Sequence, residues 1–393
     1  MKLFKQKKKI KPLPAMVYFI TLVAICIAGI TVSSYLSFSH YRVYTDMGYK
    51  SFCAISKAIN CDTISQSSYA VFLNVPVAVW GIAGYCLLLG IILCSLDQKR
   101  QKIRLLSTQF SIALIFSLIS LTLGIISSVY IHAYCIMCIA SWIINFSLLY
   151  MFWLIRRRYE NINYLQSIKQ DLIFWKTNKL TIIMAIVFLL ILGSLILFYP
   201  KYWQYHYKSI NNENTINTGI TLKGHPWIGA IDPKLTIVEF SDYQCFQCKK
   251  MHFFLRNLIA EYPDKLRIVH RHFPMDHRYN PIVTQPFHEG SGVLALIAIT
   301  ACNHNIFWEA NDYLYQYDMS KHAIYLRKIA KDIGIDLKIL RNGINKHKNK
   351  LKLFQDIKYG LQHKLSGTPA YIINGQTYTG HIPPDIIRSL DEN

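Results

Sequence analysis

Acidic residues are scarce in this sequence: 22 Asp and Glu stand against 43 Lys and Arg, and charged residues make up only 17% of the chain. Hydrophobic residues make up 52%, which is too many for an ordinary soluble enzyme. Internal repeats and long low-complexity tracts are also absent from the sequence. The 393 residues are long enough for two domains.

The basic excess raises the question of nucleic-acid binding. Most of it lies before residue 224, between apolar segments, where membrane topology explains it. Nucleic acid is therefore not an expected partner.

Five apolar stretches are each about long enough to cross a bilayer, which takes roughly 20 helical residues. They run from Ala15 to Phe38, Pro76 to Leu96, Gln109 to Ala133, Ile136 to Ile155 and Leu180 to Tyr199. The first is too long for a signal peptide, and no clear small-residue cleavage site follows it. We therefore expect an uncleaved anchor followed by four further spans.

Lysine and arginine gather on one side of these spans. They crowd the N-terminal tail, the segment 99–104 and the segment after residue 155, whereas the loop 39–75 holds only Arg42, Lys50 and Lys57. The positive-inside rule then puts the N-terminus in the cytoplasm. Five spans place everything after Tyr199 on the outer side, so we expect a multi-pass protein of the bacterial inner (cytoplasmic) membrane, surrounded by lipid.

The last part of the sequence has the pattern of a water-soluble domain. Residues 201–223 are interpreted as a juxtamembrane linker. We expect strands over 235–240 and 266–271, a helix over 249–262, a mainly helical block over 289–362, and a hairpin of 370–373 with 377–378 around Asn374-Gly375. This order predicts an α/β domain.

Six of the ten cysteines form three close pairs: Cys53 with Cys61, Cys135 with Cys138, and Cys245 with Cys248. The predicted topology places all three pairs on the outer side, where disulfides persist. Thiol–disulfide exchange moves electrons by direct contact between sulfur atoms, so three pairs on one face suggest a relay.

Cys245 and Cys248 follow a predicted strand and open a predicted helix. A helix N-terminus stabilises an anion, so Cys245 is expected to supply the attacking thiolate. The alternatives are a structural disulfide and half of a zinc site. Zinc would need further ligands, and no second cysteine pair follows at finger spacing, so we expect redox chemistry and no metal. His270, His272, His277 and His288 have no ligand-like spacing and are interpreted as surface or packing residues.

Cys135 and Cys138 begin an apolar helix at the membrane boundary, where a lipid-soluble oxidant could reach them. The alternative is two buried cysteines inside a transmembrane helix. The neighbouring loop pair, Cys53 and Cys61, favours the redox interpretation.

The segment Ile237–Cys248 resembles the active-site strand and helix of DsbA-like thioredoxin-fold proteins. Residues 268–274 resemble the next strand of that family and 307–309 its helical insertion, so that the resemblance covers nearly all of 224–393. It implies that Thr368 and Pro369 form the cis-proline loop that faces the cysteines and holds the substrate peptide. Phe246 stands where many members carry proline, which leaves the oxidising strength of the pair open.

A second resemblance covers roughly residues 15–155. Cys53, Cys61-Asp62, the segment 68–77 and the later Cys135/Cys138 pair are similar to the vitamin K epoxide reductase (VKOR) family. The resemblance implies four helices around a quinone, either ubiquinone or menaquinone, which Cys138 contacts. It also implies that the loop pair shuttles electrons to Cys138, and that Trp142 lines the quinone pocket.

These observations predict a multi-domain protein: an α-helical membrane bundle, with a four-helix VKOR-like core and a fifth transmembrane helix, followed by an α/β thioredoxin-like domain with a helical insertion. The expected boundaries are 1–158 for the bundle, 159–223 for a cytoplasmic connector, the fifth helix and an outer linker, and 224–393 for the thioredoxin-like domain. The fifth helix would carry the redox domain to the side of the loop cysteines.

The expected function is quinone-dependent thiol oxidation that generates disulfides in exported proteins. Electrons would pass from client thiols through Cys245/Cys248, Cys53/Cys61 and Cys135/Cys138 to the quinone. Two alternatives remain: a transmembrane conduit of reductant to an outer disulfide isomerase, and a non-enzymatic, membrane-tethered chaperone or binding module. Separate soluble thioredoxin-fold proteins are further candidate partners.

Overall fold

The computed structural model describes residues 14–55, 59–97, 102–159, 163–204, 216–317 and 324–391. The chain divides into two compact units, Met1–Trp203 and Gln204–Asn393. The membrane bundle and the α/β domain predicted from the sequence correspond to these two units.

Among the described residues, five helices are long and apolar enough to cross a membrane, as predicted. They are α1 (Ala15–Thr45), α3 (Val77–Ser95), α4 (Leu106–Ile126, continued by the π-helical turn Ser127–Ile131), α5 (Ile136–Tyr159) and α7 (Lys179–Phe198). A helix of about 20 residues is about 30 Å long, which matches the hydrocarbon core of a bilayer. Helix α1 continues to Thr45, beyond its predicted end at Phe38.

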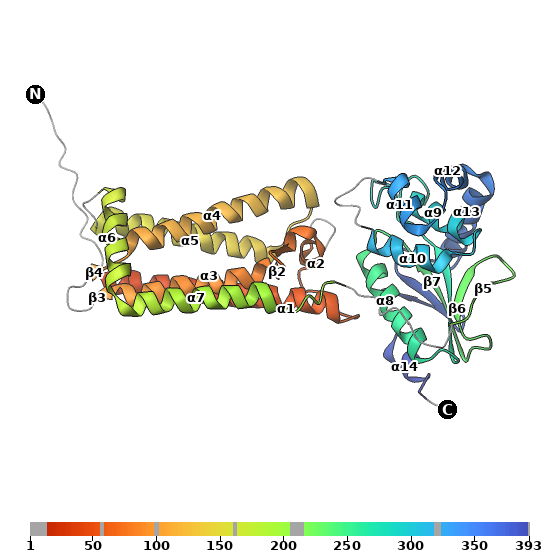
Figure 1. Cartoon of the computed structure of the whole chain (residues 1–393), viewed down its shortest axis with the longest axis horizontal. Helices are drawn as coiled ribbons and strands as arrows, with labels where there is room; N and C mark the ends of the chain where they lie inside the picture. Colours follow the sequence, from red (N-terminus) through yellow and green to blue (C-terminus); the bar gives the residue numbers. More distant parts are fainter. Residues whose placement is uncertain are drawn as a thin grey trace, which may run out of the picture. The chain divides into compact units, whose positions relative to one another are not determined.

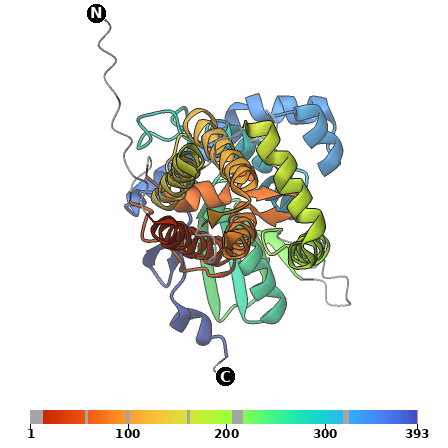
Figure 2. The same ribbon diagram turned by 90° about the vertical axis from the view of Figure 1, so that its left-hand side faces the viewer.

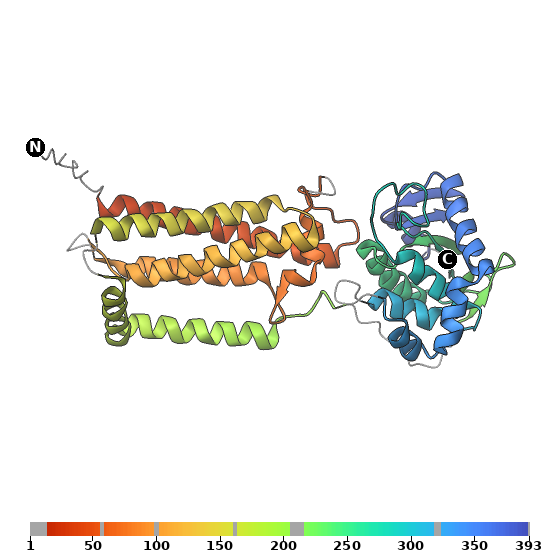
Figure 3. The same ribbon diagram turned by 90° about the horizontal axis from the view of Figure 1, so that it is seen from above.

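Helices α1, α3, α4 and α5 pack together as a bundle, seen end-on in Figure 2. Its core contains Leu22, Leu88, Leu148 and Phe152, which have no exposed surface. Helix α7 packs against α3 and lies along one side of the bundle (Figure 3). Its side chains are far more exposed, with Leu197 at 75%, as expected for a helix that faces lipid.

Short elements close the two ends of the bundle. One end carries α2 (Cys61–Gln66), a 3-10 turn (Ser68–Ala70) and the two-stranded hairpin of β1 (Val71–Phe72) and β2 (Val75–Pro76). The other end carries the pair of β3 (Leu96–Asp97) and β4 (Lys102–Ile103), together with α6 (Tyr164–Thr177). Helix α6 lies across this end (Figure 1), and the Asp171 carboxylate accepts hydrogen bonds from the backbone and hydroxyl of Thr108 at 2.8 and 2.9 Å.

The second unit is built on a six-stranded mixed sheet, as predicted for an α/β domain. Its strands are β5 (Thr218–Ile220), β6 (Pro226–Gly229), β7 (Leu235–Ser241), β8 (Leu266–His272), β9 (Ala370–Ile373) and β10 (Gln376–Thr379). They lie in the order β10-β9-β7-β8-β6-β5. Strands β7 and β8 are parallel, and the other neighbouring pairs are antiparallel.

Helix α8 (Phe246–Glu261) connects β7 to β8, and a block of helices separates β8 from β9. The block comprises α9 (Ser291–Cys302), α10 (Phe307–Gln316), α11 (Leu326–Ile333), α12 (Leu337–Asn345) and α13 (His347–Gln362), and α14 (Pro384–Arg388) follows the sheet. The apolar α9 is buried along nearly its whole length, and its Leu296 and Ile299 pack on Phe240 and Phe273. This block is the predicted helical insertion.

Two local expectations differ from the structure. Helix α8 begins at Phe246 rather than Lys249, because Cys245 caps it. Strands β5 and β6 were not predicted, and β5 lies inside the segment interpreted as a linker. Both strands are short and contain Gly or Pro, so they carry little of the alternating pattern that reveals a strand.

Candidate active site

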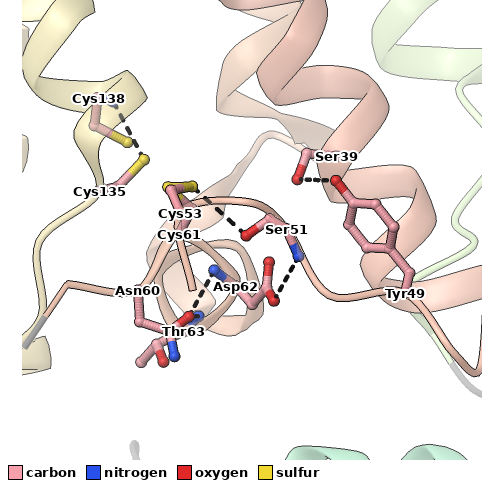
Figure 4. Close-up of a disulfide and its surroundings, with 10 residues drawn as sticks. All are labelled: Ser39, Tyr49, Ser51, Cys53, Asn60, Cys61, Asp62, Thr63, Cys135 and Cys138. Carbon is pink, nitrogen blue, oxygen red and sulfur yellow. Dashed lines mark hydrogen bonds between the residues drawn. A yellow bond between two sulfur atoms is a disulfide. The ribbon is translucent and has the colours of Figure 1, made fainter. Parts of the chain in front are cut away.

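The loop pair Cys53 and Cys61 forms a disulfide with a Cα–Cα distance of 5.6 Å, and both residues are buried. Cys61 is the first residue of α2, whose N-terminus is capped by the Asn60 side chain. The Asp62 carboxylate accepts a hydrogen bond from the Ser51 backbone at 3.1 Å, which ties the preceding loop to this helix. The local contacts therefore fix the position of the disulfide (Figure 4).

The membrane-boundary pair lies against this disulfide. Cys135 immediately precedes α5, and the Cys138 backbone N–H donates to the Cys135 Sγ at 3.2 Å. Cys53, Cys61 and Cys135 form one buried cluster against which Cys138 packs. Figure 4 shows the Cys135 side chain pointing toward the disulfide. Four of the six predicted redox cysteines are thus brought together.

Two features support sulfur exchange within this cluster. The Asn60 backbone N–H donates to the Tyr134 carbonyl at 2.9 Å, so the loop is hydrogen-bonded to the residue next to Cys135. The hydrogen bond from the Cys138 thiol, followed by the backbone N–H groups of Cys138 and Met137, lowers the pKa of Cys135, although burial acts in the opposite direction. A lowered pKa favours the thiolate, which is the species that attacks a disulfide.

A cavity of about 230 Å³ opens beside Cys138. Its wall is mainly apolar and includes Leu36, Ile64, Phe116, Ile119 and Leu123, together with Trp142. Pockets for aromatic cofactors and substrates are typically apolar with a few polar groups. The structure therefore places Cys138 and Trp142 in the wall of one cavity.

At this wall the Trp142 ring packs against a glycine of α4, Gly124. A Cβ atom at Gly124 would lie 3.2 Å from the Trp142 ring, so a larger residue would push the ring aside. Polar groups of the wall are hydrogen-bonded to one another: the Tyr85 hydroxyl donates to Asn145 Oδ1 at 2.6 Å, and Asn145 Nδ2 donates to Ser120 Oγ at 2.8 Å. The site thus combines a dithiol, an aromatic face and a hydrogen-bonded network of Tyr85, Asn145 and Ser120.

The third pair lies in the second unit. Cys245 caps α8, and the Cys248 backbone N–H donates to its Sγ at 3.4 Å. The Thr368–Pro369 peptide is cis, and the Cys245 Sγ lies 3.4 Å from the Thr368 carbonyl oxygen. Cys248 is buried, whereas Cys245 is partly exposed. The structure therefore brings these four predicted site residues together.

The two thiols of this pair have opposite pKa shifts. The hydrogen bond from the Cys248 thiol lowers the pKa of Cys245, and His288 acts in the same direction, whereas burial and the Asp242 carboxylate oppose them. Burial raises the pKa of Cys248 well above the ordinary value, and its hydrogen bond with Cys245 adds to the effect. Cys245 is thus suited to be the attacking thiolate, while Cys248 keeps its proton.

A buried carboxylate, that of Glu239, lies on the strand that precedes this pair. Glu239 on β7 is the register partner of Tyr371 on β9, and its Oε1 is 2.6 Å from His270 Nδ1. Burial, and then the charges of Cys248 and Glu239, raise the pKa of the Tyr371 hydroxyl. Cys248 and Glu239 thus both lie close enough to the Tyr371 hydroxyl to raise its pKa.

The interpretation of the histidines missed polar roles for three of them. His270 and His272 are buried, with their facing ring nitrogens 3.3 Å apart, and His288 Nδ1 is 3.1 Å from Asp242 Oδ2. His288 is distant in sequence from Cys245, so no local spacing could reveal that it lowers the pKa of Cys245. The alternation of His270 and His272 on a strand was a usable signal, since both face one side of the sheet.

Comparison with known families agrees with this arrangement. Residues 20–153 match the vitamin K epoxide reductase family, and residues 221–391 match the thioredoxin family. The chain joins a VKOR domain to a thioredoxin domain. Both recognitions made from the sequence are confirmed, and together they support a membrane protein with a thiol–disulfide redox role. The predicted boundaries 1–158, 159–223 and 224–393 remain predictions.

Curated relatives include the Na(+)/H(+) antiporter NhaA 3 of Salinispora tropica, which is 25% identical over 152 residues, or 39% of this chain and 22% of that protein. The Na(+)/H(+) antiporter NhaA of Herminiimonas arsenicoxydans is 24% identical, with the same shares of 39% and 22%. The chain thus spans less than a quarter of these two relatives, so their named transport activity is not carried over to the VKOR–thioredoxin chain.

Solved structures that resemble the chain include a thioredoxin-like oxidoreductase from Silicibacter pomeroyi, at 20% identity and a TM-score of 0.37, covering 43% of this chain and 90% of that one. Another is the thiol-disulfide exchange protein alpha-DsbA2 from Wolbachia pipientis, at 19% identity and a TM-score of 0.35, covering 43% and 86%.

Proposed function

We propose that this VKOR–thioredoxin protein oxidises the thiols of exported proteins and passes the electrons to a membrane quinone. The observation that carries the proposal is the position of the Cys135/Cys138 pair. It lies against the Cys53–Cys61 disulfide on one side and contributes Cys138 to the wall of the cavity on the other. A cysteine pair in this position can accept electrons from the loop as a disulfide and deliver them into the cavity as a dithiol.

The cavity fits a quinone headgroup in its chemistry. Its apolar wall and the Trp142 ring suit a flat aromatic ring, and Cys138 contributes a thiol to the same wall. A bound quinone, ubiquinone or menaquinone, would accept two electrons and two protons from the protein. The residues that would hold it are Trp142, Cys138 and the apolar side chains around them.

Exchange within the VKOR domain follows from the sulfur arrangement. A thiolate of the reduced loop pair attacks the disulfide of the boundary pair, and a mixed disulfide forms as one boundary thiolate leaves. The second loop thiolate then attacks the mixed disulfide and restores the Cys53–Cys61 bond. The loop pair ends as a disulfide and the boundary pair as two thiols, which is the bonding that the structure has at these two pairs.

The thioredoxin domain would supply the electrons. A client thiolate attacks the Cys245–Cys248 disulfide at Cys245, the partly exposed sulfur, and Cys248 leaves as a thiolate and takes up a proton. The second client thiol resolves the mixed disulfide, so that the client gains a disulfide and the pair becomes a dithiol. This dithiol then reduces the Cys53–Cys61 disulfide by the same two steps.

The proposal includes an orientation and a set of partners. The N-terminus lies on the cytoplasmic side of a bacterial inner membrane. The thioredoxin domain lies on the outer side, where the reduced exported clients are. The scarcity of basic residues in the loop 39–75 supports this orientation. Soluble thioredoxin-fold proteins are proposed as additional electron donors to the loop pair.

Quinone-dependent turnover separates this function from the two alternatives. Purified full-length protein should oxidise a large excess of a reduced client without oxygen when ubiquinone-1 or menadione is present. A reductant conduit would leave this client reduced and would instead reduce the disulfides of an oxidised client, and a chaperone would neither oxidise the one nor reduce the other. Replacing both Cys53 and Cys61 by Ser should remove turnover and leave Cys245–Cys248 able to oxidise one client. Continued turnover in that variant contradicts the relay.

A further inference from the structure

One polar group in the cavity wall differs from the others. His40 on α1 lines the cavity and is only 3% exposed. Its Nδ1 lies 2.8 Å from the Tyr202 hydroxyl, whereas its buried Nε2 has no hydrogen-bond partner among the described residues. Buried polar atoms nearly always have a partner, so this nitrogen indicates a ligand group that completes the site.

Tyr202 determines what His40 can offer to such a ligand. In a neutral imidazole one ring nitrogen donates a hydrogen bond and the other accepts. When the Tyr202 hydroxyl donates to Nδ1, the proton of the ring is on Nε2, which is then a donor. The carbonyl oxygens of a quinone only accept hydrogen bonds, so this tautomer is complementary to them.

Tyr202 also lies outside the part of the chain that matches the VKOR family. That match ends at residue 153, whereas Tyr202 follows α7, the fifth long helix. Aromatic contacts hold it in place: its ring centroid lies 5.1 Å from that of Tyr41 and 5.1 Å from that of Trp203. The ring of Tyr44 lies 5.0 Å from His40. The fifth helix thus ends in a segment that contacts a residue of the cavity wall.

We propose that His40 donates a hydrogen bond from Nε2 to a carbonyl oxygen of the quinone, and that Tyr202 fixes the tautomer that makes this possible. The inference rests on the proposed function, since it needs a quinone in the cavity. His40 is then a quinone-binding residue and Tyr202 a positioning residue. The fifth helix has a second role in this arrangement, because it supplies Tyr202 in addition to connecting the two domains.

The test compares two flat probes on oxidised, full-length protein in detergent. One is dimethyl-naphthoquinone, whose methyl groups block addition of thiols to the ring, and the other is dimethyl-naphthalene, which has the same shape without carbonyl oxygens. Calorimetric titration gives a dissociation constant for each probe. His40→Phe should weaken naphthoquinone binding about tenfold and leave naphthalene binding within about twofold, because one hydrogen bond is lost.

Three further variants define the roles. His40→Gln keeps an N–H donor and should restore naphthoquinone binding to within about threefold of wild type. Tyr202→Phe lets the ring proton of His40 lie on either nitrogen, and it should weaken binding of the naphthoquinone alone, by about threefold. Tyr41→Phe is the matched control, because it removes a hydroxyl from the same aromatic cluster outside the cavity wall, and it should change neither constant.

The outcomes separate this inference from the proposed function. Equal weakening of both probes by His40→Phe would mean that His40 only packs the cavity, and unchanged naphthoquinone binding would mean that it makes no hydrogen bond. Either result overturns the inference while the proposed function stands, provided that wild-type protein reduces ubiquinone-1. Failure of wild-type protein to bind or reduce any quinone overturns both.

Discussion

His288 should control the oxidising strength of the thioredoxin-domain pair. It lies 3.1 Å from Asp242 and acts with the Cys248 hydrogen bond to lower the pKa of Cys245. His288→Ala removes this contribution and also one partner of the Asp242 carboxylate, whose charge raises the pKa of Cys245. Both consequences raise the pKa of Cys245.

The size of the effect follows from the exposure of His288. A nearby opposite charge lowers a pKa by about 1–3 units. The His288 side chain is 21% exposed, so screening by water favours the lower end of that range. One unit corresponds to about 1.4 kcal/mol, or about 30 mV for a two-electron couple.

The sign of the change in oxidising strength follows from the direction of the Cys245 pKa shift. Because the pKa of Cys245 is lowered, its thiolate stabilises the reduced protein fully above the ordinary thiol pKa. That stabilisation is lost as the pH falls through the lowered value. Loss of His288 therefore weakens the reduced state at pH values where the Cys245 thiolate and a protonated His288 coexist, and the pair becomes less oxidising there by about 30 mV.

The assay uses full-length protein in which the four cysteines of the VKOR relay are replaced by Ser. Thiolate absorbance against pH gives the pKa of Cys245, and equilibration with glutathione buffers gives the potential. His277→Ala is the control, because His277 is also partly exposed yet is not among the main causes of the Cys245 shift. An unchanged pKa in His288→Ala, or an equal change in His277→Ala, would refute the reasoning.

Three further predictions concern the relay and the topology. Cys138→Ser should abolish quinone reduction and leave at most two client oxidations per protein, one for each remaining disulfide, and continued turnover would exclude Cys138 from its role. Cys248→Ser removes the resolving thiol, so a mixed disulfide of Cys245 with Cys53 or Cys61 should accumulate, with Cys53 favoured. Peptide mapping identifies the partner, and a crosslink of Cys245 to the membrane-boundary pair instead would mean that the loop pair is structural. In spheroplasts, an impermeant thiol probe should label a cysteine tag at the C-terminus and not one at the N-terminus, and the reverse pattern would contradict the orientation.

Much of the fold could be predicted because its signals are local. Each long helix is a continuous apolar run, so its position follows from hydropathy alone. The Asn374-Gly375 hairpin was predicted for a similar reason, since an Asn-Gly pair favours a tight turn. In the structure both residues have the positive φ that such a turn requires, at 50° and 78°. Helix α6 and strand β5 carry weaker signals, because α6 mixes polar with apolar residues and β5 has only three residues, one of them Gly.

The candidate site was predictable where the chemistry depends on cysteine spacing. Cys135 and Cys138 are three residues apart, so a short sequence shows that they can react with each other. His40 and Tyr202 are separated by 162 positions, and His288 lies far from Cys245 in sequence. Their proximity comes from helix packing and loop geometry, which no local pattern encodes.

The stoichiometry of electron transfer tests the central claim most directly. Purified full-length protein is mixed anaerobically with an excess of reduced client and of ubiquinone-1, and both products are counted: client disulfides by thiol labelling and quinol by its absorbance. The account predicts one quinol for every client disulfide over many turnovers, since each step moves two electrons. Client oxidation that stops at one disulfide per protein, with no quinol formed, would contradict it.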